Sequence, residues 1–234
     1  RAMRDVMRVR VGLLLWCGVG LLAACARPRP TDGFVMGQAG ATARARADSA
    51  RLPYTQADVD FMSGMIHHHA QAILISRWAA THGASPAVQR LTARIINAQS
   101  DEIAMMQTWL RDRNRDPLQV DSMGRVRTTA MDHGAHAGHD MGAMAPMPGM
   151  LTDAQLAELD AARGAEFDRL FLTYMMQHHR GAVTMVRTLF SARGAGQDET
   201  VFKFASDVEV DQSTEIRRML SMLLEMGHAP PPQD

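Results

Sequence analysis

Apolar residues recur every three or four positions along four segments of the chain, a spacing that predicts amphipathic helices. The four segments span about residues 56–82, 86–113, 153–193 and 199–226. Thr55, Ser85 and Thr152 stand where N-caps are expected, and Gly83 and Gly227 follow the ends of two segments. Aromatic residues are few while alanine and leucine are plentiful, which also favours helix over sheet. The predicted fold class is all-α.

Sequence repeats join these helices in two pairs. The pattern Phe-x-x-x-Met-x-x-His-His occupies residues 61–69 and returns at 171–179. The second helix of each pair repeats Gln-Ser-x-Glu-Ile, at 99–103 and 212–216. Two helical hairpins and a long connector predict a four-helix bundle with approximate two-fold symmetry. The predicted domain, 54–227, divides into a first hairpin at 54–113, a connector at 114–151 and a second hairpin at 152–227.

Polar residues interrupt the apolar faces at corresponding positions in the two pairs. The inward-facing imidazoles are those of His68, His69, His178 and His179. The polar residues on the apolar stripes of the other two helices are Gln99, Glu102, Gln212 and Glu215. Because a helix rises 1.5 Å per residue, counting from the hairpin turns places all eight at similar depths. We expect them to meet in one layer across the bundle.

Two interpretations of this layer stay open. A buried carboxylate needs a partner, so His–Glu pairs with glutamine hydrogen bonds would fix the register of the helices. Alternatively the layer binds metal through four histidines and the methionines one turn before them, namely His68, His69, His178, His179, Met65 and Met175. Alternative ligands, or groups that orient the imidazoles, are Glu102, Glu215, Gln99, Gln212, Met106 and Met219. Thioether with imidazole suits Cu(I), whereas imidazole with carboxylate suits Cu(II) or Zn(II).

The connector holds a second group of candidate ligands. Its stretch MDHGAHAGHDMGAMAPMPGM, residues 131–150, has no helical or strand period and predicts a loop or disorder. The candidate ligands are His133, His136, His139 and Met141, with further methionines at Met131, Met144, Met147 and Met150. A linker of biased composition is the plainer interpretation. Oxidation-prone sulfur is not needed in a linker, so we favour capture of a soft metal ion.

The N-terminal residues predict an export signal. Four arginines within the first ten residues precede a short apolar run at 11–22, too short to cross a membrane comfortably. The sequence Leu-Ala-Ala-Cys ending at Cys25 resembles a bacterial lipobox, so residues 1–24 are expected to be cleaved and Cys25 lipidated. An ordinary signal peptide or an uncleaved anchor are the alternatives. Alanine rather than aspartate at position 26 favours the outer over the inner membrane.

The segments outside the bundle are short, and the balance of charged residues and the two cysteines limit which partners and metal ligands are expected. Residues 25–53 predict a flexible tether and 228–234 a short tail. With 25 basic and 25 acidic residues the chain gives no reason to expect nucleic-acid binding. Cys17 would leave with the signal and Cys25 would carry lipid, so a soft-metal site must use methionine and histidine. Methionine is abundant, at 19 residues.

The paired motifs resemble the family called domain of unknown function 305, over about residues 54–227. The matching residues of the first half are Phe61, Met65, His68, His69, Gln71, Ala72 and Ile73. Those of the second half are MPGM at 147–150, Thr152, Gly164, Phe167, Asp168, Phe171, Leu172, Met175, His178, His179, Gly181, Ala182 and Met185. The resemblance implies a ferritin-like four-helix fold, and the family includes periplasmic copper-binding proteins. Gln177 in the second repeat corresponds to His67 in the first, which makes His67 a doubtful ligand.

The sequence therefore predicts a lipid-anchored periplasmic protein that binds copper for buffering, tolerance or delivery, with Cu(I) favoured and Cu(II) as the alternative. Its expected partners are copper ions, the membrane through the lipid, and a periplasmic protein that donates or accepts copper. The protein is expected not to be an enzyme. A metal-free lipoprotein that docks on a membrane complex is the alternative. A ferritin-like metallo-oxidase is disfavoured, because the histidine-bearing helices lack the Glu-x-x-His spacing of such centres.

Overall fold

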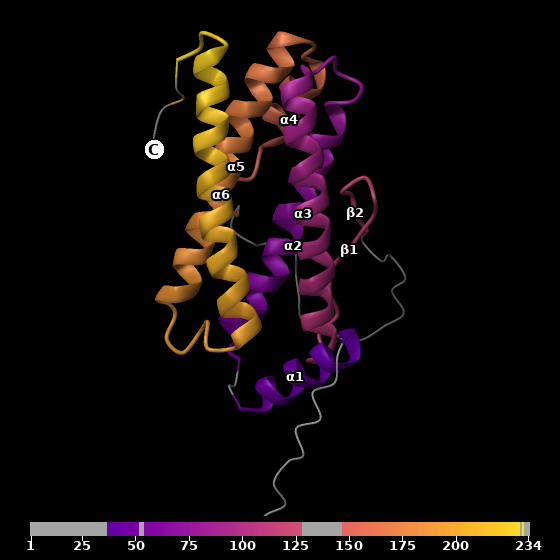
Figure 1. Ribbon diagram of the computed structural model, residues 1–234, viewed down its shortest axis with the longest axis vertical. Coiled ribbons are helices and arrows are strands. Elements are labelled where there is room, and N and C mark those ends of the chain that lie inside the picture. Colours follow the sequence, from indigo (N-terminus) through magenta and orange to yellow (C-terminus); the bar gives the residue numbers. More distant parts are fainter. Residues whose placement is uncertain (1–36, 52–53, 128–146, 230, 232–234) are drawn as a thin grey trace, which may run out of the picture. The chain divides into compact units, whose positions relative to one another are not determined.

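The computed structural model describes residues 37–51, 54–127, 147–229 and 231. Its helices are α1 (Gly37–Arg51), α2 (Gln56–Trp78), α3 (Pro86–Arg111), α4 (Asp153–Ala161), α5 (Ala165–Ser191) and α6 (Glu199–Glu225). Its strands are β1 (Gln119–Val120) and β2 (Val126–Arg127). Helices α2, α3, α5 and α6 run side by side as two hairpins, with α2 packed against α5 (Figure 1). The all-α prediction is confirmed.

The expected capping residues begin the helices. Thr55 and Asp58 form a reciprocal capping box at the start of α2, and Ser85 caps α3 ahead of a proline in the first turn. Asp198 accepts the Thr200 and Val201 amides at the start of α6. The helix ends differ slightly from the prediction, since α2 stops at Trp78 and residues 79–83 form a turn.

The prediction of one helix over 153–193 is wrong, because this segment forms two helices. Thr152 starts α4 through a capping box with Gln155, but the chain turns at 162–164 before α5 begins. Gly164 adopts a left-handed conformation with φ 58°. Its amide donates to the His82 carbonyl at 2.8 Å, which satisfies the freed backbone group across the α2–α3 turn.

Two segments expected to be irregular contain regular structure. Residues 37–51 of the predicted flexible tether form α1, because the run is rich in alanine and no proline follows position 30 until 53. Within the connector, β1 and β2 form an antiparallel ribbon. This ribbon lies so close to α2 that a Cβ on Gly124 would stand 2.5 Å from the Ala70 carbonyl oxygen. Among the described helices, none combines the length and apolar character needed to span a membrane.

Two buried aspartates at equivalent positions of the repeats tie the hairpins together. Asp58 on α2 accepts the Gly196 amide from the α5–α6 turn at 2.7 Å. Asp168 on α5 accepts the Ser85 amide from the α2–α3 turn at 3.1 and 3.2 Å. Both side chains are almost fully buried. Each hairpin therefore fixes the turn of the other.

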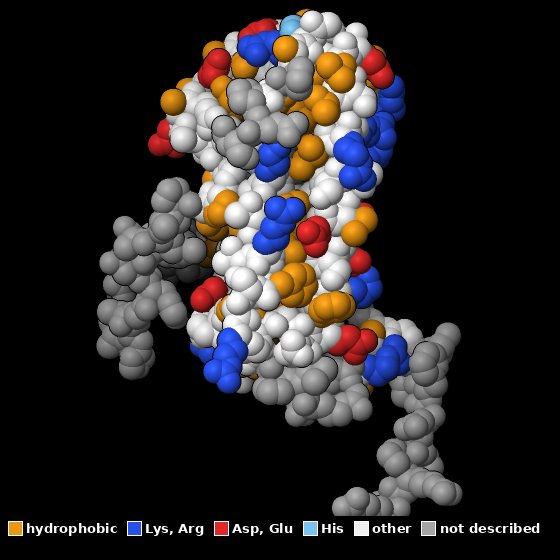
Figure 2. Space-filling view, turned by 90° about the vertical axis from the view of Figure 1, so that its left-hand side faces the viewer, with side chains coloured by type: hydrophobic (Ala, Val, Ile, Leu, Met, Phe, Trp, Pro, Cys, Tyr) orange, Lys and Arg blue, Asp and Glu red, His pale blue; other side chains and the backbone are white. Residues whose placement is uncertain are grey.

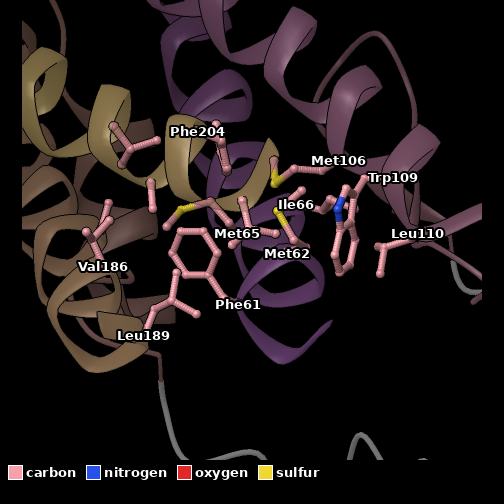
Figure 3. Close-up of a cluster of buried hydrophobic side chains, with 14 of the residues drawn as sticks. Phe61, Met62, Met65, Ile66, Met106, Trp109, Leu110, Val186, Leu189 and Phe204 are labelled. Atoms are coloured by element: carbon pink, nitrogen blue, oxygen red, sulfur yellow. The ribbon is translucent and has the colours of Figure 1, made fainter. Parts of the chain in front are cut away.

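The apolar core consists of two clusters. The first gathers Phe61, Met65 and Phe204 with parts of α3 and α5, and Figure 3 shows these side chains directed into it. The second gathers residues nearer the α2–α3 turn, including Phe167 and Phe171. On the outside, hydrophobic side chains are scattered among basic and acidic ones on the face shown in Figure 2. The space between the two clusters is where the polar layer lies.

Candidate metal centre

The four repeat histidines occupy the middle of the bundle and are fully buried, each with 0 % exposure. The rings of His68 on α2 and His178 on α5 face each other, with centroids 3.7 Å apart and planes tilted by 39°. The close packing of α2 on α5 brings the two rings together. The expected convergence of the imidazoles is confirmed.

The adjacent histidines of each repeat bind the glutamates of the neighbouring helices. His69 Nε2 lies 2.7 Å from Glu102 Oε2 on α3, and His179 Nε2 lies 2.7 Å from Glu215 Oε2 on α6. The glutamate side chains remain 25 % and 19 % exposed. Each carboxylate therefore connects a buried imidazole with the outside of the bundle.

The polar layer separates the two apolar clusters along α3, α5 and α6. Along α5, the second cluster ends at Met176 and the first begins at Ala182, with the histidines between them. On α3 the change falls between Ile95 and Ile103, around Gln99 and Glu102. This arrangement explains how polar groups in the middle of an apolar face are accommodated, since they share one level with other polar groups.

Among the residues that the structure describes, five imidazole nitrogens of this layer are buried without a hydrogen-bond partner. They are both ring nitrogens of His178 and the Nδ1 atoms of His68, His69 and His179. Burial lowers the pKa of His68 to about 3 and holds the pKa of His178 well below 6.5. Burial is the largest cause of both pKa shifts, and neighbouring histidines contribute to them. At neutral pH His68 and His178 are therefore neutral, the form in which imidazole binds metal ions.

Residues 147–151, the end of the connector, cover the layer on the α2–α5 side. His68 Nε2 lies 3.1 Å from the Pro148 carbonyl oxygen. Gln71 makes two hydrogen bonds with the Leu151 backbone, donating to its carbonyl at 3.1 Å and accepting its amide at 2.8 Å. The segment lies directly on the α5 backbone, because a Cβ on Gly181 would stand 2.0 Å from the Pro148 oxygen.

The predicted methionine ligands lie in the apolar clusters on either side of the layer. Met65 and Met106 belong to the first cluster, and Met175 and Met219 to the second, all with 0 % exposure. These positions are those of methionines that fill an apolar core. Met147 lies against Gly64, where a Cβ would be 3.5 Å from its sulfur, one turn before His68.

The other candidate residues fall outside the part of the chain that the structure describes. These are His133, His136, His139, Met141 and the lipidation candidate Cys25. Within the described ranges, no three His, Cys, Asp or Glu side chains converge to hold one metal ion. The layer thus offers a pair of facing imidazoles rather than a complete set of ligands.

The two glutamates differ in their surroundings. Burial raises the pKa of Glu215, but the hydrogen bond with His179 and the charge of Arg94 outweigh it, so the pKa lies below its ordinary value. Arg94 Nη2 lies 3.6 Å from Glu215 Oε1. Glu102 forms its ion pair with His69. Sequence reasoning missed Arg94, which belongs to a polar helix face and carries no repeat signal.

Two further contributors were visible in the sequence only as part of the family pattern. Gln71 and the MPGM stretch match the family, yet nothing in their spacing shows that they contact each other. The structure places Pro148 and Leu151 against His68 and Gln71 across about 80 residues of chain. The depth count did not distinguish the two members of each histidine pair, and the structure shows that His69 and His179 bind the carboxylates.

Comparison with known proteins matches residues 58–223 to the family Domain of unknown function (DUF305). A secreted DUF305 protein of Streptomyces coelicolor has 28 % identity and a TM-score of 0.58, covering 76 % of this chain and 98 % of that one. CopM in the Cu(II)-bound form has 29 % identity and a TM-score of 0.50, covering 72 % and 97 %. Its Cu(I)-bound form has 26 % identity and a TM-score of 0.51, covering 72 % and 96 %.

A curated relative matches a shorter stretch. Uncharacterized protein L153 of Acanthamoeba polyphaga mimivirus is 37 % identical over 62 residues, which are 25 % of this chain and 41 % of that protein. The chain therefore spans less than half of that relative.

Proposed function

Since the chain belongs to the DUF305 family, we propose that it is a copper-binding protein whose buried histidine layer receives the ion. The observation that carries this proposal is the set of five unpartnered imidazole nitrogens, centred on the facing rings of His68 and His178. Buried polar atoms without partners are uncommon in folded proteins and call for a ligand or another explanation. Similarity to CopM, solved with Cu(I) and with Cu(II), supports copper as the ion.

The chemistry of the layer favours Cu(I). Two neutral imidazoles supply two strong donors, and Cu(I) accepts low coordination numbers and thioether ligands. Met147 is half-buried, and its sulfur lies against Gly64, one turn before His68 on α2. The glutamates orient His69 and His179 through their Nε2 atoms and leave both Nδ1 atoms without a partner.

Export and lipid attachment at Cys25 are part of the same proposal, and they would place the protein in the periplasm on the outer membrane. There it would buffer copper or pass it to a periplasmic partner without catalysing a reaction. Similarity to a secreted DUF305 protein supports a place outside the cytoplasm. The Cys25→Ser variant tests the anchor. We expect it to move from the membrane fraction to the soluble periplasmic fraction, and an unchanged distribution would contradict lipidation.

The metal-free alternative, an interaction protein with a structural histidine layer, has one observation in its favour. In the described part of the chain, no three acidic, cysteine or histidine side chains form a metal cage. In that case His69–Glu102 and His179–Glu215 would only fix helix register. Copper binding distinguishes the two functions.

Competition with a chromogenic Cu(I) chelator, under anaerobic conditions and with the full chain, tests the proposal. The wild-type chain is expected to withdraw Cu(I) from the chelator. The His68→Leu/His178→Leu double variant is expected to lose more than about 100-fold in Cu(I) affinity. Mutating residues that only orient a metal's ligands costs about 10- to 100-fold, and this variant removes the ligands themselves. Unchanged affinity in a folded double variant, checked by circular dichroism, would contradict the proposal.

His67→Gln is the matched control. It removes a histidine next to the layer and installs the residue that the second repeat carries at Gln177. Its Cu(I) affinity is expected to equal that of the wild type.

A variant with alanine at four connector positions separates the second group of candidate ligands. The changed residues are His133, His136, His139 and Met141. We expect a lower number of bound Cu(I) ions and retention of the tightest site. Loss of the tightest site would move the proposed centre from the layer to the connector.

A further inference from the structure

The two sides of the histidine layer are closed to different degrees. On one side α2 packs against α5, and residues 147–151 cover the rings. On the other side, a pocket of about 210 Å³ lies between α3 and α6, and one of about 540 Å³ is lined by α1, α3 and α6. Glu102 and Asp211 line both pockets. The pockets therefore adjoin each other and reach the glutamate that binds His69.

The smaller pocket is lined by equivalent residues of the two repeats. Gln99 and Gln212 are 3 % and 4 % exposed, and the side-chain carbonyl oxygen of each has no hydrogen-bond partner. Glu102 and Glu215 line the same pocket. Two buried, unsatisfied acceptor oxygens beside two carboxylates form surroundings that a cation or its water shell would satisfy.

The charge of both pockets attracts cations. The larger pocket is lined by five carboxylates against two basic side chains, Arg44 and Lys203. The smaller has three carboxylates against Arg94. Burial raises the pKa of Asp211, and Glu102, Asp207 and Glu215 raise it further, as expected where negative potential accumulates. Acid-lined clefts concentrate cations and accelerate their association.

These carboxylates are placed to pass a cation inward rather than to hold it. Glu102 and Glu215 each touch the pocket and a fully buried imidazole, at 2.7 Å. In the described ranges no three of the acidic and histidine side chains converge on one point, so a cation finds no complete cage in the pocket. The next donors inward are the unpartnered nitrogens of the histidine layer.

We propose that the groove between α3 and α6 is the entrance by which a metal cation reaches the buried histidines, with Gln99, Gln212 and Asp211 forming its first binding step. This inference rests on the proposed copper binding. The cation would keep part of its water shell between the glutamines and exchange it for imidazole beside Glu102 or Glu215.

Stopped-flow measurement of Cu(II) association with the full chain tests the entrance. Cu(II) is paramagnetic and quenches tryptophan fluorescence, and Trp78 and Trp109 pack with the apolar clusters that flank the layer. Asp211→Asn removes one charge that lines both pockets. Ala98→Phe fills the smaller pocket without changing charge or adding a tryptophan to the signal. Glu225→Gln, an exposed change at the far end of α6, is the control.

We expect Asp211→Asn to slow association about threefold at low ionic strength and to weaken its salt dependence. Ala98→Phe is expected to slow association at every salt concentration, whereas Glu225→Gln leaves the rate unchanged. Wild-type association rates in both groove variants would overturn the entrance and leave copper binding intact. A wild-type chain that holds no copper at equilibrium would overturn both.

Discussion

The two repeats carry nearly the same residues into the layer, yet their surroundings differ. His69–Glu102 and His179–Glu215 have the same length, 2.7 Å. The central histidines are unequal, because His68 contacts the Pro148 carbonyl oxygen while His178 has no partner at either ring nitrogen. The chain has one connector for two hairpins, so only one repeat can receive its end.

This difference separates what the repeat specifies from what the connector adds. The repeat sets the depth of the imidazoles and their pairing with carboxylates. The connector makes the two central histidines unequal, because the Pro148 carbonyl oxygen at its end contacts a ring nitrogen of His68 and none of His178. Of the two rings, His178 is the better prepared to accept a metal ion, since both its nitrogens lack partners and its pKa is lowered by burial.

The largest effect is expected from the aspartates that join the hairpins. Asp58 accepts from Thr55 N at 2.6 Å, Thr55 Oγ1 at 2.7 Å and Gly196 N at 2.7 Å, while Asp168 accepts only the Ser85 amide. Hydrogen bonds to charged groups contribute about 1.5–3 kcal/mol each. Asp58→Ala should lower the free energy of unfolding by about 4 kcal/mol and Asp168→Ala by about 2 kcal/mol. Urea denaturation measures both, and equal losses would show that the repeats are equivalent at this level.

The pH dependence of the free energy of unfolding shows whether both His68 and His178, or only one of them, are held neutral in the folded protein. Burial holds the folded pKa of His68 at about 3, below its unfolded value of 6.5, and lowers that of His178 in the same direction. Below pH 6.5 the unfolded state therefore binds more protons than the folded state. The free energy of unfolding decreases as the pH is lowered from 6.5 to 3. Each imidazole should cost the metal-free protein about 2 kcal/mol between pH 6.5 and 5.

In the His178→Leu variant only His68 remains of the two central histidines. The decrease in the free energy of unfolding between pH 6.5 and 5 that these histidines cause should therefore be about half of that in the wild type. Urea denaturation of metal-free wild type and variant at pH 6.5 and 5 checks the difference, and carboxylate titration is common to both proteins. The same slope in both proteins would mean that His178 is not held neutral.

Replacing each central histidine separately should change stability in opposite directions. His178→Leu removes two buried unsatisfied nitrogens and is expected to raise the free energy of unfolding of the metal-free protein by about 1 kcal/mol at neutral pH. His68→Leu leaves the Pro148 carbonyl without its partner and is expected to lower it by about 1–2 kcal/mol. Thermal denaturation in the presence of a chelator measures both. Equal changes would indicate that the connector end contributes nothing to the asymmetry.

The smallest effect concerns the outer ends of the two His–Glu pairs. Arg94 is 52 % exposed and 3.6 Å from Glu215, so Arg94→Ala should cost less than about 0.5 kcal/mol. The pKa of Glu215 should rise toward its ordinary value. Carboxyl titration by nuclear magnetic resonance checks this, and an unchanged pKa of Glu215 in the variant would contradict the Arg94–Glu215 contact.

Local signals made most of the fold predictable. Apolar periodicity and capping residues gave α2, α3 and α6 nearly to their ends, and the repeated histidines and glutamates identified the layer before the structure. The break at Gly164 was not predictable from periodicity, because α4 and α5 keep helical patterns on both sides. It depends on the His82 carbonyl, which lies in another hairpin.

The parts of the site that escaped prediction depend on contacts between distant segments. Nothing in the sequence around Gln71 indicates that it binds the Leu151 backbone. The thioethers of Met65 and Met175 share the periodicity of the histidines, and this periodicity is equally that of core residues. The groove between α3 and α6 follows from how the hairpins pack, which no single helix encodes.

The contact between Pro148 and residue 181 affects how mutational scans of this family should be interpreted. The backbone of Gly181 contacts the Pro148 peptide group directly, and a methyl group at position 181 would overlap the Pro148 oxygen. An alanine at this position would displace the end of the connector and release the ring of His68. Such a variant would register as defective in metal uptake although glycine donates no ligand, so sensitivity to substitution is a poor guide to coordination here.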